Sequence, residues 1–245
     1  MAEGHSPLEQ FTIHRLIPID IGGVDVSITN STLFMGLAVL LATAFLVLAA
    51  SPRALVPGRL QSAGEMTYEL VAGVIRDNAG TAGMKYFPII FTIFIFILFT
   101  NLLGLVPYAF TVTSHIAVTF TIAFTVFVGI TLIGAYKHGF KYLSIFLPSG
   151  VPMWLMPLLF VIEVISYMTR PISLSVRLFA NMMAGNIMLK VFAGFVVSLG
   201  LLAGWAPLAF IVGLTGLELL VAVLQAYVFT ILTCIYLNDA LHLHH

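Results

Sequence analysis

The chain has 245 residues, of which 60% are hydrophobic and 8% charged, and its mean hydropathy is +1.10. Soluble domains carry about 25% charged residues, so this composition excludes a domain whose whole surface faces water. The formal net charge of +0 gives no basic excess of the kind that binds nucleic acid. The composition predicts an all-α integral membrane protein.

The first half of the chain contains three apolar runs that have the length of a membrane span, about 20 residues. Residues 1–30 precede them as an N-terminal segment, and they lack the basic and apolar regions of a signal peptide. The runs cover 31–50, 88–107 and 116–136 and contain no Asp, Glu, Lys or Arg. We therefore expect three membrane-crossing helices here.

Residues 62–79 have a different pattern, with Met66, Leu70, Val74 and Ile75 at helical spacing. Acidic residues come early in this segment and a basic residue comes late, which suits the helix dipole. This pattern predicts a short amphipathic helix that lies on the membrane surface.

The second half of the chain contains two longer apolar segments, at 152–197 and 207–238. Each exceeds one perpendicular span, so we expect two tilted helices that form an antiparallel hairpin around Leu202. The prediction is thus five membrane-crossing helices and one surface helix, which together form a single membrane domain over 1–245.

Basic residues predict the orientation of the chain. Six of them follow the first and third spans: Arg53, Arg59, Arg76, Lys85, Lys137 and Lys141. Two crossings lie between these loops, so both loops are on the same side of the membrane. The positive-inside rule places that side in the cytoplasm, with the N-terminus outside and the C-terminus inside.

The long segments hold charged residues, which are expensive inside a membrane and usually mark an ion or substrate pathway. On the first segment, polar residues separated by 3, 4, 3, 4 and 4 positions lie on one helical face: Glu163, Ser166, Arg170, Ser173, Arg177 and Asn181. On the second segment, Thr215, Glu218 and Gln225 form a matching stripe.

Folding the two segments about Leu202 predicts three polar levels. Asn186 would lie level with Glu218 toward the outside, Arg177 with Gln225 in the middle, and Glu163 with Asp239 toward the inside. Structural interpretations stay open for single residues. Arg170 can extend to the inner interface, the two serines can bond backbone carbonyls, and Glu218 can balance a buried cation.

Two motifs in this hairpin resemble subunit a of the F-type ATP synthase membrane sector. They are RPISLSVRLFANMMAGN, which contains Arg177 and Asn181, and LELLVAVLQAYVFTILTCIYL, which contains Glu218 and Gln225. The resemblance extends over the chain from about residue 31, and includes TNLLGLVPY at 100–108. It implies a stator that faces a rotating c-ring of small proteolipid subunits and that binds b-type subunits of the peripheral stalk.

The resemblance assigns Arg177 as the essential cation that faces the rotor carboxylate. Arginine stays protonated at any working pH, so it can attract that carboxylate without carrying protons itself. We expect Glu218 and Asn186 to form the outer proton path, and Glu163, Ser166 and Asp239 the inner one. Supporting positions are Asn181, Gln225, Ser173 and Arg170.

Two features depart from the family pattern. Family members often carry ionisable residues at the levels of both Asn186 and Glu218, whereas only Glu218 can titrate here. Gly104 also occupies a position where some members have an acid. These departures leave the residues of the outer path open.

No cofactor or metal is expected, and no P-loop sequence is present, so the chain is not expected to be an enzyme by itself. A secondary transporter or proton channel is the alternative class, although no internal repeat is visible. A membrane enzyme is disfavoured because only His115, of seven histidines, comes near a span. The expected location is a bacterial inner membrane, with a mitochondrial inner membrane as the alternative.

Overall fold

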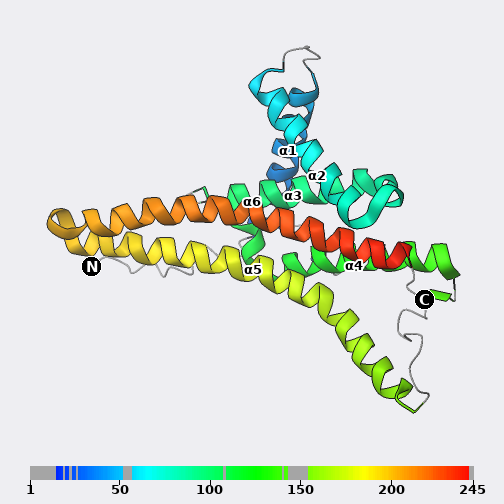
Figure 1. Cartoon of the computed structure of the whole chain (residues 1–245). Coiled ribbons are helices and arrows are strands. Elements are labelled where there is room, and N and C mark those ends of the chain that lie inside the picture. The colour runs from blue at the N-terminus through cyan, green and yellow to red at the C-terminus, as the bar shows by residue number, and fades with distance from the viewer. Residues whose placement is uncertain are drawn as a thin grey trace.

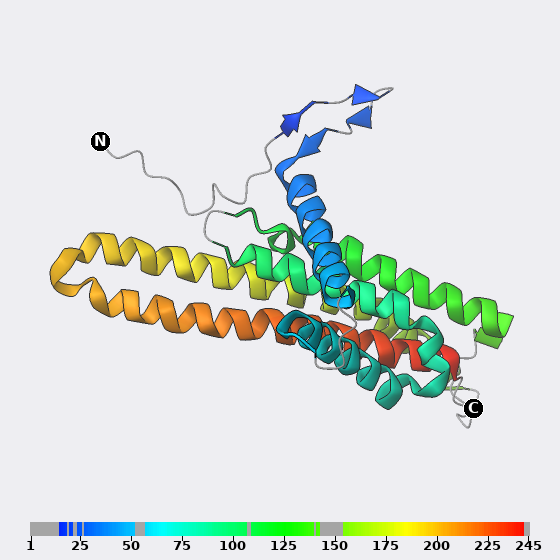
Figure 2. The ribbon, with the colours of Figure 1, turned by 90° about the horizontal axis from the view of Figure 1, so that it is seen from above.

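The computed structural model describes residues 15–18, 20–21, 24–25, 27–51, 57–106, 109–139, 141–142 and 154–242. Helices dominate these residues. The long helices α5 and α6 run side by side from their connecting turn to the middle of the molecule, where the N-terminal part of α5 bends away (Figure 1). The other helices pack around one half of this pair, so that its connected end projects beyond them (Figure 2).

The chain enters its first helix through a short β-hairpin. Strand β1 (Arg15–Ile17) pairs antiparallel with β4 (Ile28–Thr29), and β2 (Asp20–Ile21) pairs with β3 (Val24–Asp25). Helix α1 (Asn30–Ala50) follows directly, and the side chain of Thr29 caps it by accepting a hydrogen bond from the backbone N–H of Thr32.

Helix α2 (Arg59–Gly83) leads through the 3-10 turn η2 (Met84–Tyr86) into α3 (Phe87–Gly104). Helix α2 is amphipathic as predicted, but its buried stripe is formed by Val71, Val74, Ile75 and Ala79. Met66 and Leu70 are 70% and 43% exposed. The buried face is thus turned toward α3 and α6, because those helices supply the apolar surface against which α2 packs.

The 3-10 turn η3 (Val112–Ser114) connects to α4 (Ile116–His138). Gly139 follows α4 with φ +57°, a backbone conformation that favours glycine at a helix end. Helix α5 (Met156–Ala203) and helix α6 (Trp205–Leu241) form the long pair. Gly200 has φ +60° where the chain begins to turn between them, so the turn lies close to the predicted pivot.

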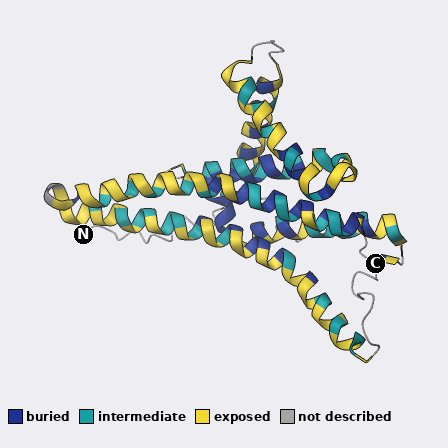
Figure 3. Cartoon of the chain, viewed as in Figure 1, coloured by how far each residue is buried: buried dark blue, intermediate teal, exposed yellow. Residues whose placement is uncertain are grey.

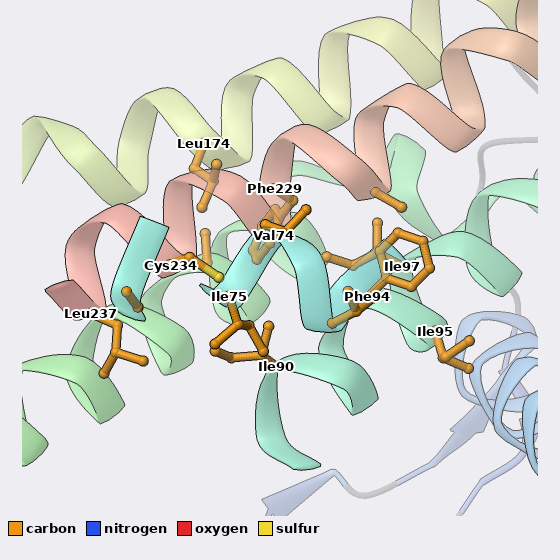
Figure 4. Close-up of a cluster of buried hydrophobic side chains, with 14 of the residues drawn as sticks. Val74, Ile75, Ile90, Phe94, Ile95, Ile97, Leu174, Phe229, Cys234 and Leu237 are labelled. Atoms are coloured by element: carbon orange, nitrogen blue, oxygen red, sulfur yellow. The ribbon is translucent and has the colours of Figure 1, made fainter. Parts of the chain in front are cut away.

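The apolar core lies where α2, α3, α5 and α6 meet (Figure 4). Val74 and Ile75 from α2, Ile97 from α3 and Phe229 from α6 are each at most 6% exposed. Inside a membrane the close packing of such side chains, rather than their removal from water, holds helices together, so this cluster fixes α6 against the rest of the protein.

Five helical stretches of the described residues have the length and apolar character of a membrane span, and one of them joins α2 and α3. The predicted all-α fold with a C-terminal helical hairpin is therefore confirmed. The helix bounds differ from prediction by a few residues, and the expected ends at 107 and 152 lie outside the described residues.

Candidate functional site

One face of helix α5, around the central Arg177, is exposed and not covered by the other described helices. Arg177, Ser173 and Asn181 are exposed, as the predicted stripe requires. Ile172 and Val176 on the same side are 49% and 42% exposed. Arg177 forms no ion pair with any residue that the structure describes. A permanent cation on an exposed, largely apolar helix face can attract an anionic group from outside the chain.

Asn181 and Gln225 form the central polar contact of the hairpin. The side-chain amide of Asn181 donates to Oε1 of Gln225 at 2.9 Å. Gln225 is only 4% exposed, and its Nε2 has no partner among the described residues. This hydrogen bond fixes the two helices one turn beyond Arg177 in the direction of the turn.

Glu218 lies on α6 with its carboxyl group against Gly185 of α5. A Cβ at Gly185 would collide with Oε1 of Glu218, so the absent side chain makes room for the carboxyl group. Both carboxyl oxygens are buried and have no hydrogen-bond donor within the described part of the chain. Burying a charged carboxylate without a partner is costly, so this group is suited to exchange a proton.

Asn186 follows Gly185 at the same level of α5. Its Nδ2 donates to the backbone carbonyl of Met182 at 2.8 Å. The predicted level of Asn186 and Glu218 is therefore present, although Gly185 is the residue shown in contact with the carboxyl group.

The inner end of the hairpin carries an ion pair. Nη1 of Arg170 lies 3.2 Å from Oδ2 of Asp239, and both side chains are partly exposed. The predicted level of Glu163 with Asp239 was wrong, because Arg170 contacts Asp239. The predicted level of Arg177 with Gln225 was likewise shifted by one turn, to Asn181. Glu163 is half-buried and Ser166 is exposed on α5.

These shifts have a geometric cause. Side chains of an α-helix lean toward its N-terminus. In this hairpin the lean carries α5 side chains away from the turn and α6 side chains toward it. A contact therefore joins an α5 residue to an α6 residue farther from the turn, as in Asn181 with Gln225 and Arg170 with Asp239.

The structure adds a buried polar group that the prediction had missed. Asn101 of α3 is 0% exposed, and its Nδ2 lies 3.4 Å from the backbone carbonyl of Ala222, between Glu218 and Gln225 on α6. Its Oδ1 has no partner among the described residues. The sequence did contain a signal for this residue, because Asn101 is an amide within an otherwise apolar run. Gly185 gave no such signal, because glycine has no side chain.

His115 is the histidine that the sequence places near a span. It is half-buried before α4, and its ring stacks on Phe110 at 5.1 Å between centroids. Burial lowers its pKa from 6.5, so the ring is neutral at neutral pH.

The fold and these side chains define a polytopic helical membrane protein with ionisable groups on a long hairpin. The family model described as ATP synthase A chain matches residues 32–238. The ATP synthase subunit a of Rhodospirillum rubrum is 59% identical over 240 residues, which is 98% of this chain and 100% of that protein. The subunit a of Chelativorans sp. (strain BNC1) is 61% identical over 245 residues, 98% of each chain.

The chain belongs to the ATP synthase A chain family. It is a membrane-sector subunit of an F-type ATP synthase and a non-catalytic part of that complex. This result confirms the resemblance found in the two sequence motifs and connects the chain with ATP synthesis and proton transport.

Proposed function

We propose that this chain is the proton-translocating stator subunit, which provides two offset half-channels to the carboxylates of a rotating c-ring. The observation that carries the proposal is Arg177, a permanent cation on an exposed face of α5 that pairs with no acidic residue in the described part of the chain. Small side chains surround it on this face at Ser173, Ala180 and Ala184. Small residues allow another helix to approach closely, so a rotor helix can bring its carboxylate to Arg177.

Arg177 separates the two half-channels in this proposal. It favours the ionised rotor carboxylate and drives proton release, because it keeps its own proton. A proton cannot pass directly between the half-channels through a side chain that never deprotonates. The membrane potential supplies about 2.3 kcal/mol per charge per 100 mV to bias the rotation.

The outer half-channel runs through Glu218 and Asn186. Support comes from the Glu218 carboxyl group, which is buried without a hydrogen-bond donor among the described residues. Within the described residues, Asn101 and Gln225 add polar atoms that have no hydrogen-bond partner, near the same part of α6. Such groups usually bind internal water, and a water chain through them can bring protons to Glu218.

The inner half-channel runs through Glu163 and Ser166, with Asp239 at its edge. Glu163 can accept a proton from the rotor after the ring has turned. The ion pair with Arg170 holds Asp239 beside this path. Asn181 and Gln225 support the path by fixing the hairpin beside Arg177.

The proposed partners are the c-ring and the b-type subunits of the peripheral stalk. An apolar groove of about 450 Å³ lies between α3, α4 and α6, and none of its lining residues comes from α5. This groove leaves the Arg177 face free and suits a transmembrane helix of a further subunit. The relatives come from bacteria, so we propose the bacterial inner membrane, with the N-terminus outside.

Cross-linking tests the stator function. A cysteine at Ile172, on the exposed face of α5, that carries a photoreactive cross-linker should capture a small proteolipid subunit in the purified complex. A cysteine at Leu132, which is 63% exposed on α4, is the matched control and should not. Proton transport by the isolated chain, without such a ring, would instead favour a self-contained channel or transporter.

A further inference from the structure

The N-terminal part of α5, from Met156 to Arg170, has few buried side chains in the structure as described. It bends away from α6 ahead of Pro171 (Figure 1), because proline removes a backbone hydrogen bond inside the helix. Most of its side chains are exposed (Figure 3). Tyr167 is the one buried residue between 154 and 170.

Tyr167 connects this part of α5 to two other elements. Its hydroxyl lies 2.7 Å from Oγ1 of Thr131 on α4 and 2.9 Å from the hydroxyl of Tyr142. Its ring packs on Phe127 of α4 at 4.7 Å between centroids. Three hydroxyl groups from separate elements therefore meet at one point.

Tyr142 is itself held firmly. It is 6% exposed, and its ring lies against Gly134, where any Cβ would collide with it. Burial raises the pKa of Tyr142 above its usual value, and the hydrogen bond with Tyr167 acts in the same direction. The hydroxyl thus stays protonated and available for hydrogen bonding.

Arg170 makes the second attachment. Its guanidinium lies 5.3 Å from the ring centroid of Tyr167 and 4.9 Å from that of Tyr236, in addition to its ion pair with Asp239. The space among these side chains is only about 10 Å³. This is close to the smallest volume that holds one water molecule, so the cluster is tightly packed.

Glu163, Tyr167 and Arg170 are spaced by 4 and 3 residues and share one face of α5. Fixing Tyr167 and Arg170 therefore fixes the rotation of the helix and the direction of Glu163. We propose that Tyr167 is a positioning residue for proton release, which holds the bent N-terminal part of α5 so that Glu163 faces the inner half-channel. This inference rests on the proposed function.

The test uses the assembled complex in membrane vesicles and measures proton flux against the pH of the inner side. Tyr167→Phe removes both hydroxyl contacts but keeps the ring beside Arg170, and Thr131→Val removes one contact. Thr43→Val is the control, because Thr43 is exposed on α1 and donates its hydrogen bond to the backbone carbonyl of Val39 in its own helix. Other titratable groups at the cluster are Arg170, Tyr142, Tyr236 and Asp239, with Lys137 and His138 bonded to Leu241 nearby.

We expect Tyr167→Phe to lower flux per assembled complex by about tenfold, since displacing a reacting group by about 1 Å can cost about 100-fold. The dependence of proton flux on the pH of the inner side should shift. The dependence on the pH of the outer side, measured in the same vesicles, should not. Thr131→Val should give a smaller change of the same kind, and Thr43→Val none. A purely structural residue would reduce the amount of complex and leave the profile of the remaining complex unchanged.

Wild-type flux and inner-side profile in Tyr167→Phe would overturn the inference, as would failure of both variants to assemble. Glu163→Gln separates this result from the proposed function. If Glu163→Gln blocks flux while Tyr167→Phe does not, the positioning role of Tyr167 is wrong and the proposed inner half-channel still stands. If Glu163→Gln has no effect, the proposed inner half-channel is wrong.

Discussion

The carboxyl group of Glu218 on α6 lies directly against Gly185 on α5, in space that the Cβ of any other residue would occupy. Both oxygens of this carboxyl group are buried without a hydrogen-bond donor among the described residues. The backbone of one helix thus determines where the ionisable group of the other can lie.

Gly185→Ala should therefore impair proton transport. Alanine favours a helix over glycine by about 1 kcal/mol, so the substitution supports the fold locally while it displaces the carboxyl group. We expect slower ATP-driven proton pumping at an unchanged amount of assembled complex. Gly194→Ala on the same helix is the control, because no atom lies within 4 Å of its added Cβ. Equal rates in the two variants would show that the position of Glu218 is unimportant.

Replacing the acid itself gives a second prediction. Glu218→Gln keeps the shape of the side chain, but the glutamine side chain cannot exchange a proton. Proton flux should therefore fall, and the remaining flux should depend less on pH. Slowing rather than complete loss is expected, because Asn186 and the nearby polar groups can still bind water. The measurement is passive proton flux in vesicles over a range of pH.

Glu65→Gln is the control for this experiment, because it removes a carboxylate from an exposed position on α2. Its flux should match that of the wild type. Full flux with the wild-type pH dependence in Glu218→Gln would exclude this residue from the outer half-channel.

The topology of the chain provides a third prediction. Tyr136 at the end of α4 is 96% exposed, so a cysteine in its place should react with a membrane-impermeant thiol reagent from the cytoplasmic side. A cysteine at Gln10 should react only from the opposite side. The native Cys234 is 0% exposed and should not interfere. Labelling of both positions from one side would contradict the arrangement with five crossings.

Sequence periodicity predicted the helices well because burial inside a membrane requires long apolar runs, and a charge in such a run stands out. Arg177 and Glu218 became candidate site residues for this reason. The prediction placed Arg177 level with Gln225, whereas Asn181, one turn away, makes the contact. Counting residues from the pivot ignores the lean of helical side chains toward the N-terminus of their helix.

Other features have no signal in a single sequence. Gly185 matters through an absent side chain, and its neighbour Glu218 comes from another helix. Tyr167 and Tyr142 meet only after α4 has packed against α5. Such contacts depend on tertiary packing, which periodicity along the chain does not determine.

The central claim is that Arg177 separates the two half-channels. In the proposed mechanism, Arg177 draws the rotor carboxylate into its ionised form and blocks direct passage of protons, and Arg177→Ala removes this cation. Arg177→Lys keeps a charge but loses the planar guanidinium and deprotonates more readily, so it should also fail to couple. Arg76→Ala, on the exposed side of α2, is the control and should behave as the wild type.

The most direct measurement is ATP synthesis and passive proton flux in vesicles that contain equal amounts of assembled complex. Arg177→Ala should abolish proton-driven ATP synthesis and increase the passive proton leak through the membrane sector. ATP synthesis at close to the wild-type rate in Arg177→Ala vesicles would contradict the mechanism of two half-channels.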